Sequence, residues 1–299
     1  DAADHFRQRQ PLYNVGTIEH LEGLYQYTPA FALAFIPFLW ITPSATAIVH
    51  TILHILAYAG LYMLWYHIFH ELGLRRSEEM MAWTLPVWLV FSAFWSDLGY
   101  LNLTIIVALL ASLLLDAVLH ERLTLAVLCV TAIVAIKPMW AFAALLPMLT
   151  GHWKFFLRMV AYALLAQFAV AGATALAGGV HYASQQYAAY IRFLSHLSQN
   201  FPWRGPQSGF LGYNHSIRQV VLFLASSTPT AWNIATGVKW ALLAPIGIIA
   251  ARAPARAESA HPAAVLELAF VLYLGAFLWL DMVWEVSLGI AVFVYLVGS

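Results

Sequence analysis

Three basic side chains lie where the long apolar runs of this sequence are interrupted. Lys137 directly precedes Pro138 inside such a run. Arg204 lies in a loop rich in Gly and Pro, and Arg218 lies near the start of a short apolar stretch. Lysine and arginine neutralise phosphate, and the arginine fork can bind two phosphate oxygens at once. We therefore predict that these three cations bind the phosphate of an anionic, lipid-linked headgroup.

Hydrogen-bonding and aromatic side chains occupy the same interruptions. Those that we expect to contact a sugar or an acceptor are Asn102, Asn214, His215, Trp284 and Glu285. Each alone has a structural explanation, because such residues also cap helices or lie at membrane interfaces. Together with the three cations, they place a polar set on one face of an otherwise apolar chain.

Other polar residues have simpler explanations. His50 and His54 have the spacing of paired metal ligands on a helix, but no carboxylate or third histidine lies near them in sequence. We predict that they are hydrogen-bonded between packed helices. Lys239 lies close enough to the end of its apolar run to snorkel to the interface. Asp116, one turn before His120, leaves an ion or proton pathway open as a second possibility.

The sequence contains no glycine-rich phosphate loop, no Walker lysine motif and no Asp-x-Asp metal clamp. A soluble nucleotide donor is therefore not indicated, and we expect neither a metal ion nor a cofactor. The 14 Lys and Arg balance the 14 Asp and Glu, so no basic field predicts nucleic acid as a partner. Cys129 is the only cysteine, which excludes intrachain disulfides and multi-thiolate metal sites.

The elements that position these residues must lie in a membrane. Of the 299 residues, 62% are hydrophobic and only 9% are charged, against about a quarter charged in soluble domains. The mean hydropathy is +0.76. This composition argues against a cytosolic enzyme or a disordered chain and predicts an all-α polytopic membrane protein.

Apolar runs long enough, or nearly long enough, to span a bilayer recur along the chain, at about 20 residues for each span. They are Thr46–Phe69, Met80–Trp95, Leu101–Leu119, Phe155–Ala177, Ala231–Ala251, Ala263–Leu280 and a shortened run at Trp284–Val297. Leu123–Leu149 contains Lys137-Pro138 at its middle, so we predict two short helices there. Pro29–Trp40 is too short to cross alone and is expected to be a re-entrant or juxtamembrane helix. The whole is a bundle of about eight to ten transmembrane or re-entrant helices.

The distribution of Arg and Lys beside the span ends predicts the orientation. Arg75-Arg76, Arg122, Lys154 and Arg252 can share the cytoplasmic side. The polar set then faces outward, from what we expect to be a bacterial inner membrane. Residues 178–229 lie on the outer side, with an amphipathic interfacial helix over His181–Asn200. Residues 1–299 form a single membrane domain, expected to be truncated at both ends.

Several motifs, in order, resemble glycosyltransferase family 87. They are Leu12-Tyr13, Tyr27-Thr28-Pro29-Ala30-Phe31, Gly99-Tyr100-Leu101-Asn102, Lys137-Pro138, Asn214-His215-Ser216-Ile217 and Trp284-Glu285. Three positions depart from the family pattern, because Tyr100 and His215 each replace a glutamine and the histidine that often follows the tryptophan motif is absent. The resemblance covers most of the chain.

The resemblance implies a GT-C membrane enzyme that uses polyprenyl-phosphate sugars, with mannosyltransferases as the known type. It implies inverting, metal-independent transfer to a lipid or glycan acceptor in the cell envelope, and adds Tyr27 to the sugar or acceptor residues. The general base of such enzymes is an aspartate on the first outer loop. Counting back from Leu12-Tyr13 places it at or upstream of Asp1, so Asp1 and Asp4 are fallback candidates.

Two other classes stay open from the sequence. A transporter or lipid flippase would also be polytopic, but many such folds show internal repeats and polar groups at the bilayer midplane. We find no internal repeat, and the polar groups gather at one face, which favours the enzyme. A non-catalytic membrane scaffold is the third possibility, because the expected base lies at the very start of the chain or before it.

Overall fold

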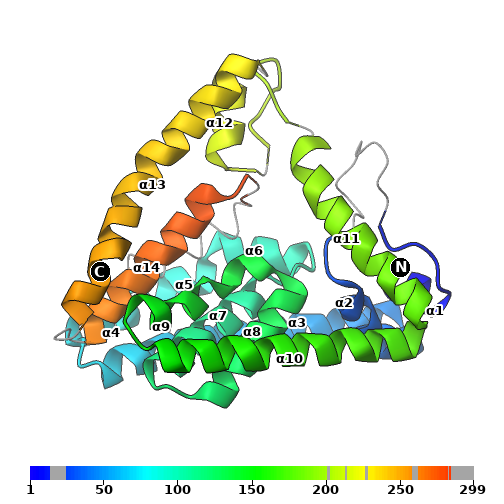
Figure 1. Cartoon of the computed structure of the whole chain (residues 1–299), viewed down its shortest axis with the longest axis horizontal. Helices are drawn as coiled ribbons and strands as arrows, with labels where there is room; N and C mark the ends of the chain where they lie inside the picture. The colour runs from blue at the N-terminus through cyan, green and yellow to red at the C-terminus, as the bar shows by residue number, and fades with distance from the viewer. Residues whose placement is uncertain are drawn as a thin grey trace.

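The computed structural model describes residues 1–13, 25–200, 203–212, 214–225, 228–257, 262–281 and 283. Throughout these residues the chain forms helices and connecting loops, with no β-strand (Figure 1). The all-α class predicted from composition is therefore confirmed.

Three of the described helices are long and apolar enough to cross a membrane. They are α3 (Pro43–Glu71), α10 (Trp153–Gly178) and α13 (Pro229–Ala257), the last over its segment Pro229–Ile249. Less than a fifth of each spanning window is buried inside the protein. Apolar side chains therefore face outward along these helices, where lipid is the solvent that accommodates them. The chain is an integral membrane protein.

A sharp bend replaces two of the expected spans. The run Met80–Trp95 does not form one helix, because α4 (Arg75–Trp83), α5 (Leu85–Val90) and α6 (Ser92–Gly99) divide it. Pro86 lies in the first turn of α5, where a helix tolerates a residue without an N–H. The same residue cannot continue the preceding helix, because it cannot donate the next backbone hydrogen bond. The pair Leu85–Gly99 and Thr104–Leu119 then meet at 114°, as one broken span or a re-entrant loop. The second of these segments is α7.

The predicted break at Lys137-Pro138 is confirmed. Helix α8 (Leu123–Ile136) ends there, the 3₁₀ helix η2 (Pro138–Leu145) follows, and α9 (Leu146–Leu149) completes the segment. Four apolar segments are too short to cross unaided at full bilayer thickness. They are Pro29–Trp40, which contains α2 (Pro29–Ala34) and η1 (Ile36–Trp40), and Leu123–Ile136, Pro138–Leu149 and Ala264–Trp279.

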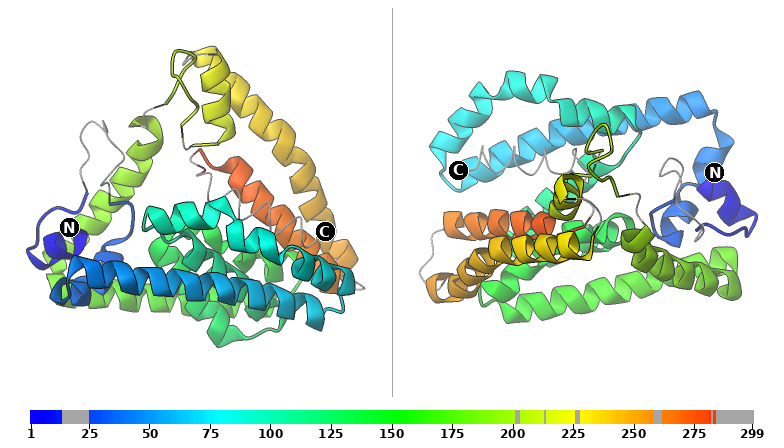
Figure 2. Two further views of the ribbon diagram at one scale, coloured as in Figure 1. Left: turned by 180° about the vertical axis from the view of Figure 1, so that it is seen from behind. Right: turned by 90° about the horizontal axis from the view of Figure 1, so that it is seen from above.

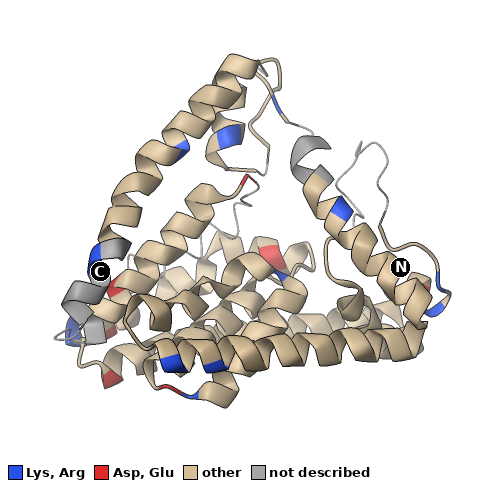
Figure 3. Ribbon diagram, viewed as in Figure 1, with Lys and Arg blue, Asp and Glu red and all other residues tan. Residues whose placement is uncertain are grey.

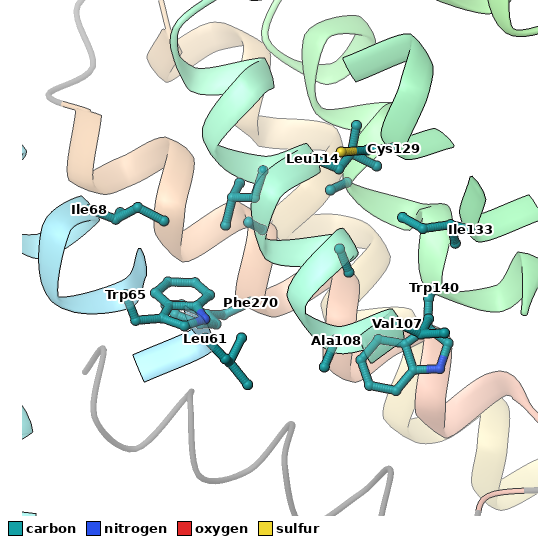
Figure 4. Packing of buried hydrophobic residues seen from close by; sticks show 14 of the residues in the cluster. Leu61, Trp65, Ile68, Val107, Ala108, Leu114, Cys129, Ile133, Trp140 and Phe270 are labelled. Atoms are coloured by element: carbon teal, nitrogen blue, oxygen red, sulfur yellow. The ribbon is translucent and has the colours of Figure 1, made fainter. Parts of the chain in front are cut away.

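Four helices form the central row of the molecule. Helix α3 packs on α7, α7 on α8, and α8 on α10. The view from above shows α3 and α10 on opposite sides of the molecule (Figure 2). Helix α14 (Pro262–Trp279) lies beside α13 and also contacts α7, η2 and α9. The packed side chains at the centre come from α3, α7, α8, η2 and α14 (Figure 4). Small alanines at these contacts let backbones approach closely, which is how membrane helices gain packing energy.

A second layer joins the N-terminal segment to the predicted amphipathic helix. That helix is α11 (Val180–Asn200), and it packs through Tyr182, Tyr190 and Phe193. Its partners include Phe6 of α1 (Ala2–Arg7) and Tyr13. The helix itself is thus confirmed, while its place at the outer membrane surface stays a prediction. The shorter helix α12 (Ile217–Ala225) packs on α13.

Candidate functional site

The break between α8 and η2 assembles a polar site, which we call the lysine site: Tyr27, Asn102, Thr104 and Lys137. The Lys137 Nζ donates to Asn102 Oδ1 at 3.2 Å and to Thr104 Oγ1 at 3.1 Å. The Tyr27 hydroxyl points to the same Oδ1 at 3.5 Å, the outer limit of a hydrogen bond. The structure therefore brings together Tyr27, Asn102 and Lys137, which the sequence had placed in one functional set.

The bend before α7 holds Asn102 in place. Asp97 is completely buried, and its Oδ2 accepts a hydrogen bond from the Ile105 N–H at 3.0 Å. The same oxygen lies 3.3 Å from His54 Nε2, so α3 is tied to the bend. His54 is fully buried, which confirms the interhelical role predicted for it. The Asn102 N–H donates to the Asp97 carbonyl at 2.9 Å, which fixes the turn that carries the lysine site.

Tyr27 is fixed against the end of α8. The neighbouring Thr28 hydroxyl donates to the Ala135 carbonyl at 2.7 Å, within the last turn before the break. Burial and the nearby Asp97 charge raise the pKa of Tyr27 to about 12. Its phenol therefore keeps its proton at physiological pH and acts as a hydrogen-bond donor.

A second polar site lies between α12, α13 and the end of α14, and we call it the tryptophan pocket. Its volume is about 380 Å³. Arg218, Lys239 and Asp281 are its charged residues, with both cations bound to the Asp281 carboxylate. The pocket is also lined by Met139, Thr236, Trp240, Trp279 and Leu280. Charged side chains are sparse elsewhere on these helices (Figure 3).

Aromatic rings and a backbone carbonyl hold the two cations of the tryptophan pocket. The Arg218 guanidinium lies 4.2 Å from the ring centre of Trp232 and 5.8 Å from that of Trp203. Lys239 Nζ donates to the Trp279 carbonyl at 2.8 Å, and the residue is only 8% exposed. Lys239 is thus an ion-pair partner inside the protein rather than the snorkelling side chain that the sequence predicted.

Asn214 clips the end of α14 to the start of α12. Its Nδ2 donates to the Asp281 carbonyl at 3.0 Å, and its Oδ1 accepts from the Val283 N–H at 3.0 Å. The His215 N–H donates to the Val283 carbonyl at 2.7 Å. Both polar ends of the buried Asn214 amide are therefore used inside the protein. The structure gives Asn214 a positioning role beside the tryptophan pocket, and the sugar contacts predicted for it and His215 stay predictions.

Arg204, another predicted phosphate ligand, lies on the loop that packs against α12. Its guanidinium stacks on Phe210 at 4.3 Å, and its N–H and carbonyl bind the side chain of Gln219. Gly212 packs against it with φ of 88°, and a Cβ there would lie 2.9 Å from Arg204 Nε. The positive φ of Gly212 favours glycine, and a Cβ would also push against the Arg204 side chain. Arg204 shapes the loop before α12 and does not line the tryptophan pocket as described.

The fallback bases lie on α1 and directly before it. Asp4 is bound by Arg7 of the same helix and by Gln8, which follows the helix, each at 2.7 Å on an exposed surface. Asp1 precedes the helix, and its carbonyl accepts from the His5 N–H at 2.9 Å. No described contact joins either residue to the lysine site. Trp284 and Glu285 lie outside the described residues.

A separate charged cluster joins the ends of α3 and α7. Glu71, Asp116 and His120 offer ligand atoms within 4.8 Å of one another, the type of set that could hold a metal ion. His120 already pairs with Glu71 through Nε2 at 3.0 Å and with Asp116 through Nδ1 at 3.1 Å. Arg122 pairs with the other Asp116 oxygen at 3.2 Å. Both ring nitrogens of His120 thus face carboxylates, and the cluster joins the two helices.

Sequence reasoning missed the convergence of Lys239 and Asp281. The two residues lie on different runs, and their pairing depends on α13 and α14 packing side by side. The available signal was that each charge interrupts an apolar run within reach of the same membrane face.

Comparison with known proteins agrees with these features. The model of glycosyltransferase family 87 matches residues 25–281, which include the lysine site, Arg218, Lys239 and Asp281. No curated protein and no solved structure gives a significant match. The chain therefore belongs to glycosyltransferase family 87.

Proposed function

We propose that this glycosyltransferase moves a sugar, mannose, from a polyprenyl-phosphate donor to a lipid or glycan acceptor. The reaction takes place at the outer face of a bacterial inner membrane. The observation that carries the proposal is the tryptophan pocket, in which Arg218 and Lys239 lie together among apolar and aromatic side chains. A lipid phosphate needs this combination, because cations bind its phosphate while apolar surface accepts the first part of its chain.

The chemistry follows from the donor. A carboxylate base takes the proton of an acceptor hydroxyl, whose oxygen attacks the anomeric carbon from the face opposite the phosphate. The bond from that carbon to the phosphate oxygen breaks, and its electron pair leaves with the polyprenyl phosphate. Such a base contributes about 10²–10⁴-fold. The base is Asp1, Asp4 or an aspartate upstream of them.

The cations stabilise the charge that grows on the leaving phosphate. Arg218 and Lys239 do so within the tryptophan pocket. Lys137 acts from the lysine site, next to η2, whose residue Met139 also lines the tryptophan pocket. Asn102 presents an amide to the hydroxyls of the sugar or the acceptor, with the Tyr27 phenol beside it. The amide nitrogen of Asn102 is free of hydrogen bonds to the residues that the structure describes, so it can donate to a hydroxyl.

The outward orientation has one structural support. The C-terminal ends of α3 and α7 carry the Glu71, Asp116 and His120 cluster. Beside this cluster, His152 pairs with Glu121 at 3.6 Å. These residues adjoin the Arg and Lys that predict the cytoplasmic side. The lysine site lies at the other end of α7, near the bend before that helix.

The test uses purified protein in liposomes that contain radiolabelled polyprenyl-phosphate mannose and bacterial membrane lipid as the acceptor. Arg218→Ala and Lys137→Ala are each expected to lower the transfer rate by about 10²-fold or more, as loss of a preorganised charge at a reacting group does. Arg76→Ala, an exposed arginine far from both sites in the chain, is the matched control and keeps the wild-type rate. Unchanged rates in both site variants would exclude the phosphate assignment. Lipid movement across the liposome without any transfer would indicate a flippase.

A further inference from the structure

The carboxylate of Asp281 fills the position between the two cations of the tryptophan pocket. It binds Arg218 through Oδ2 and Lys239 through Oδ1. We propose that Asp281 is a built-in competitor for the donor phosphate that makes the pocket favour a singly charged phosphodiester over a doubly charged phosphomonoester. This inference rests on the proposed function, since the donor is such a diester and the released lipid phosphate is such a monoester.

The cations do not depend on Asp281 for their positions. Trp232 and Trp203 hold the Arg218 guanidinium, and the Trp279 carbonyl holds Lys239 Nζ. Cation–π contacts and a hydrogen bond of this kind persist when the carboxylate moves. An incoming phosphate therefore meets two cations that are already in place, and the Asp281 carboxylate moves aside for it but remains in the pocket.

The Asp281 side chain has room to move while its backbone stays fixed. It follows the end of α14, and Asn214 holds its carbonyl at 3.0 Å. The side chains of Arg218, Lys239 and Asp281 are 20%, 10% and 24% exposed, so the ion pairs lie at the pocket wall rather than in a sealed core. The volume of about 380 Å³ falls within the about 300–1,000 Å³ of small-molecule sites.

The charges of the pocket then discriminate between donor and product. Two cations and one carboxylate leave a charge of +1, which a phosphodiester neutralises. A phosphomonoester carries about −1.5 to −2 at pH 7, so its extra charge meets the Asp281 carboxylate. The phosphate and the carboxylate would then be two neighbouring negative charges, which repel each other strongly where water is partly excluded. Asp281 thus favours the donor over the lipid phosphate and promotes release of the lipid phosphate after transfer.

The test measures binding of farnesyl phosphate, a monoester, and methyl farnesyl phosphate, a diester, to the purified full chain. Asp281→Asn is expected to tighten monoester binding about tenfold and diester binding by less than about threefold. Asp281→Glu, which keeps the charge, is expected to retain the wild-type ratio of the two affinities. Thr236→Asp adds a second carboxylate to the pocket wall and is expected to change the ratio in the opposite direction.

The outcomes separate this inference from the proposed function. An Asp281→Asn protein that keeps its unfolding temperature but shows the wild-type ratio would overturn the role of Asp281, whether or not mannose is transferred. If Asp281→Asn does not fold, an unchanged ratio in Thr236→Asp overturns it equally. Shifts in both variants with no sugar transfer would support the charge selection and contradict the transferase donor proposed above.

Discussion

Asn102 is the residue that joins the parts of the lysine site, since a single amide oxygen accepts from three directions. Lys137 Nζ, the Tyr27 hydroxyl and the Leu103 N–H all point to it. An oxygen with this many donors is strongly polarised, and the amide nitrogen is correspondingly a better donor. Asn102 therefore positions the lysine, and in the proposed reaction it also presents a group to the substrate.

Asn102→Asp is expected to lower the transfer rate at least tenfold without lowering the unfolding temperature. The new carboxylate would pair with Lys137, which keeps the site folded but neutralises the charge needed at the phosphate. Radiolabelled transfer and thermal unfolding, measured on the same preparation, test this prediction. Asn233→Asp, on the exposed side of α13, is the matched control. A rate equal to that of the wild type would mean that Lys137 acts without its charge.

Tyr27→Phe gives a contrasting result at the same site. Its hydroxyl lies 3.5 Å from Asn102 Oδ1, too far for a strong bond, so its loss should reduce the rate less than about threefold. The ring still stacks on Phe31, with centroids 4.6 Å apart, and this contact remains in the variant. Transfer rates of Tyr27→Phe and Asn102→Asp, measured side by side, test which variant loses more activity. A larger loss in Tyr27→Phe would show a direct contact between the phenol and the substrate.

At the scale of elements, bends and breaks rather than straight spans create both sites. The 114° bend before α7 exposes the turn that carries Asn102, and the break after α8 frees Lys137. Irregular backbone at membrane depth is tolerated where the protein itself satisfies its polar groups. Asp97 does this at the bend, and Thr28 does it at the break.

Asp97→Ala is expected to lower the free energy of unfolding by about 1–3 kcal/mol, because the buried Ile105 N–H and His54 lose their acceptor. Asp97→Asn keeps one acceptor oxygen and should recover a large part of this loss. Denaturation in detergent, followed by tryptophan fluorescence, measures the difference. An Ala variant as stable as the Asn variant would show that the carboxylate does not hold the bend.

The sequence predicts the elements better than it predicts the contacts between them. Pro138 marks the break, and the spacing of Tyr190 and Phe193 marks the amphipathic helix α11, because local backbone chemistry and periodicity decide both. Hydropathy alone merges α4, α5 and α6 into one run, since a short bend is as apolar as a span. The pairing of Lys239 with Asp281 depends on how α13 and α14 pack, and no local pattern encodes that packing.

At the scale of the molecule, the lysine site and the charged cluster lie on two different sides. The lysine site lies at one end of α7, and the Glu71, Asp116 and His120 cluster lies at the other. This separation gives the orientation a direct test, because the only native cysteine, Cys129, is buried.

Single cysteines introduced on the two sides are expected to react differently in intact cells. Gln207→Cys, in the exposed loop before α12, should be labelled by a maleimide that cannot cross the membrane. Arg76→Cys, at the exposed start of α4, should be labelled only after the membrane is permeabilised. The reverse pattern would place both sites on the cytoplasmic side and would contradict the polyprenyl-phosphate reaction at the outer face.

The bond from Thr28 to Ala135 has a consequence for biogenesis. The two residues are 107 positions apart, yet both emerge from the ribosome before α10 begins. Chains fold from the N-terminus during synthesis, so the lysine site can close while the second half is still being inserted. The tryptophan pocket needs residues as late as Asp281 and closes last. A nascent chain therefore forms the tryptophan pocket only after the lysine site beside it.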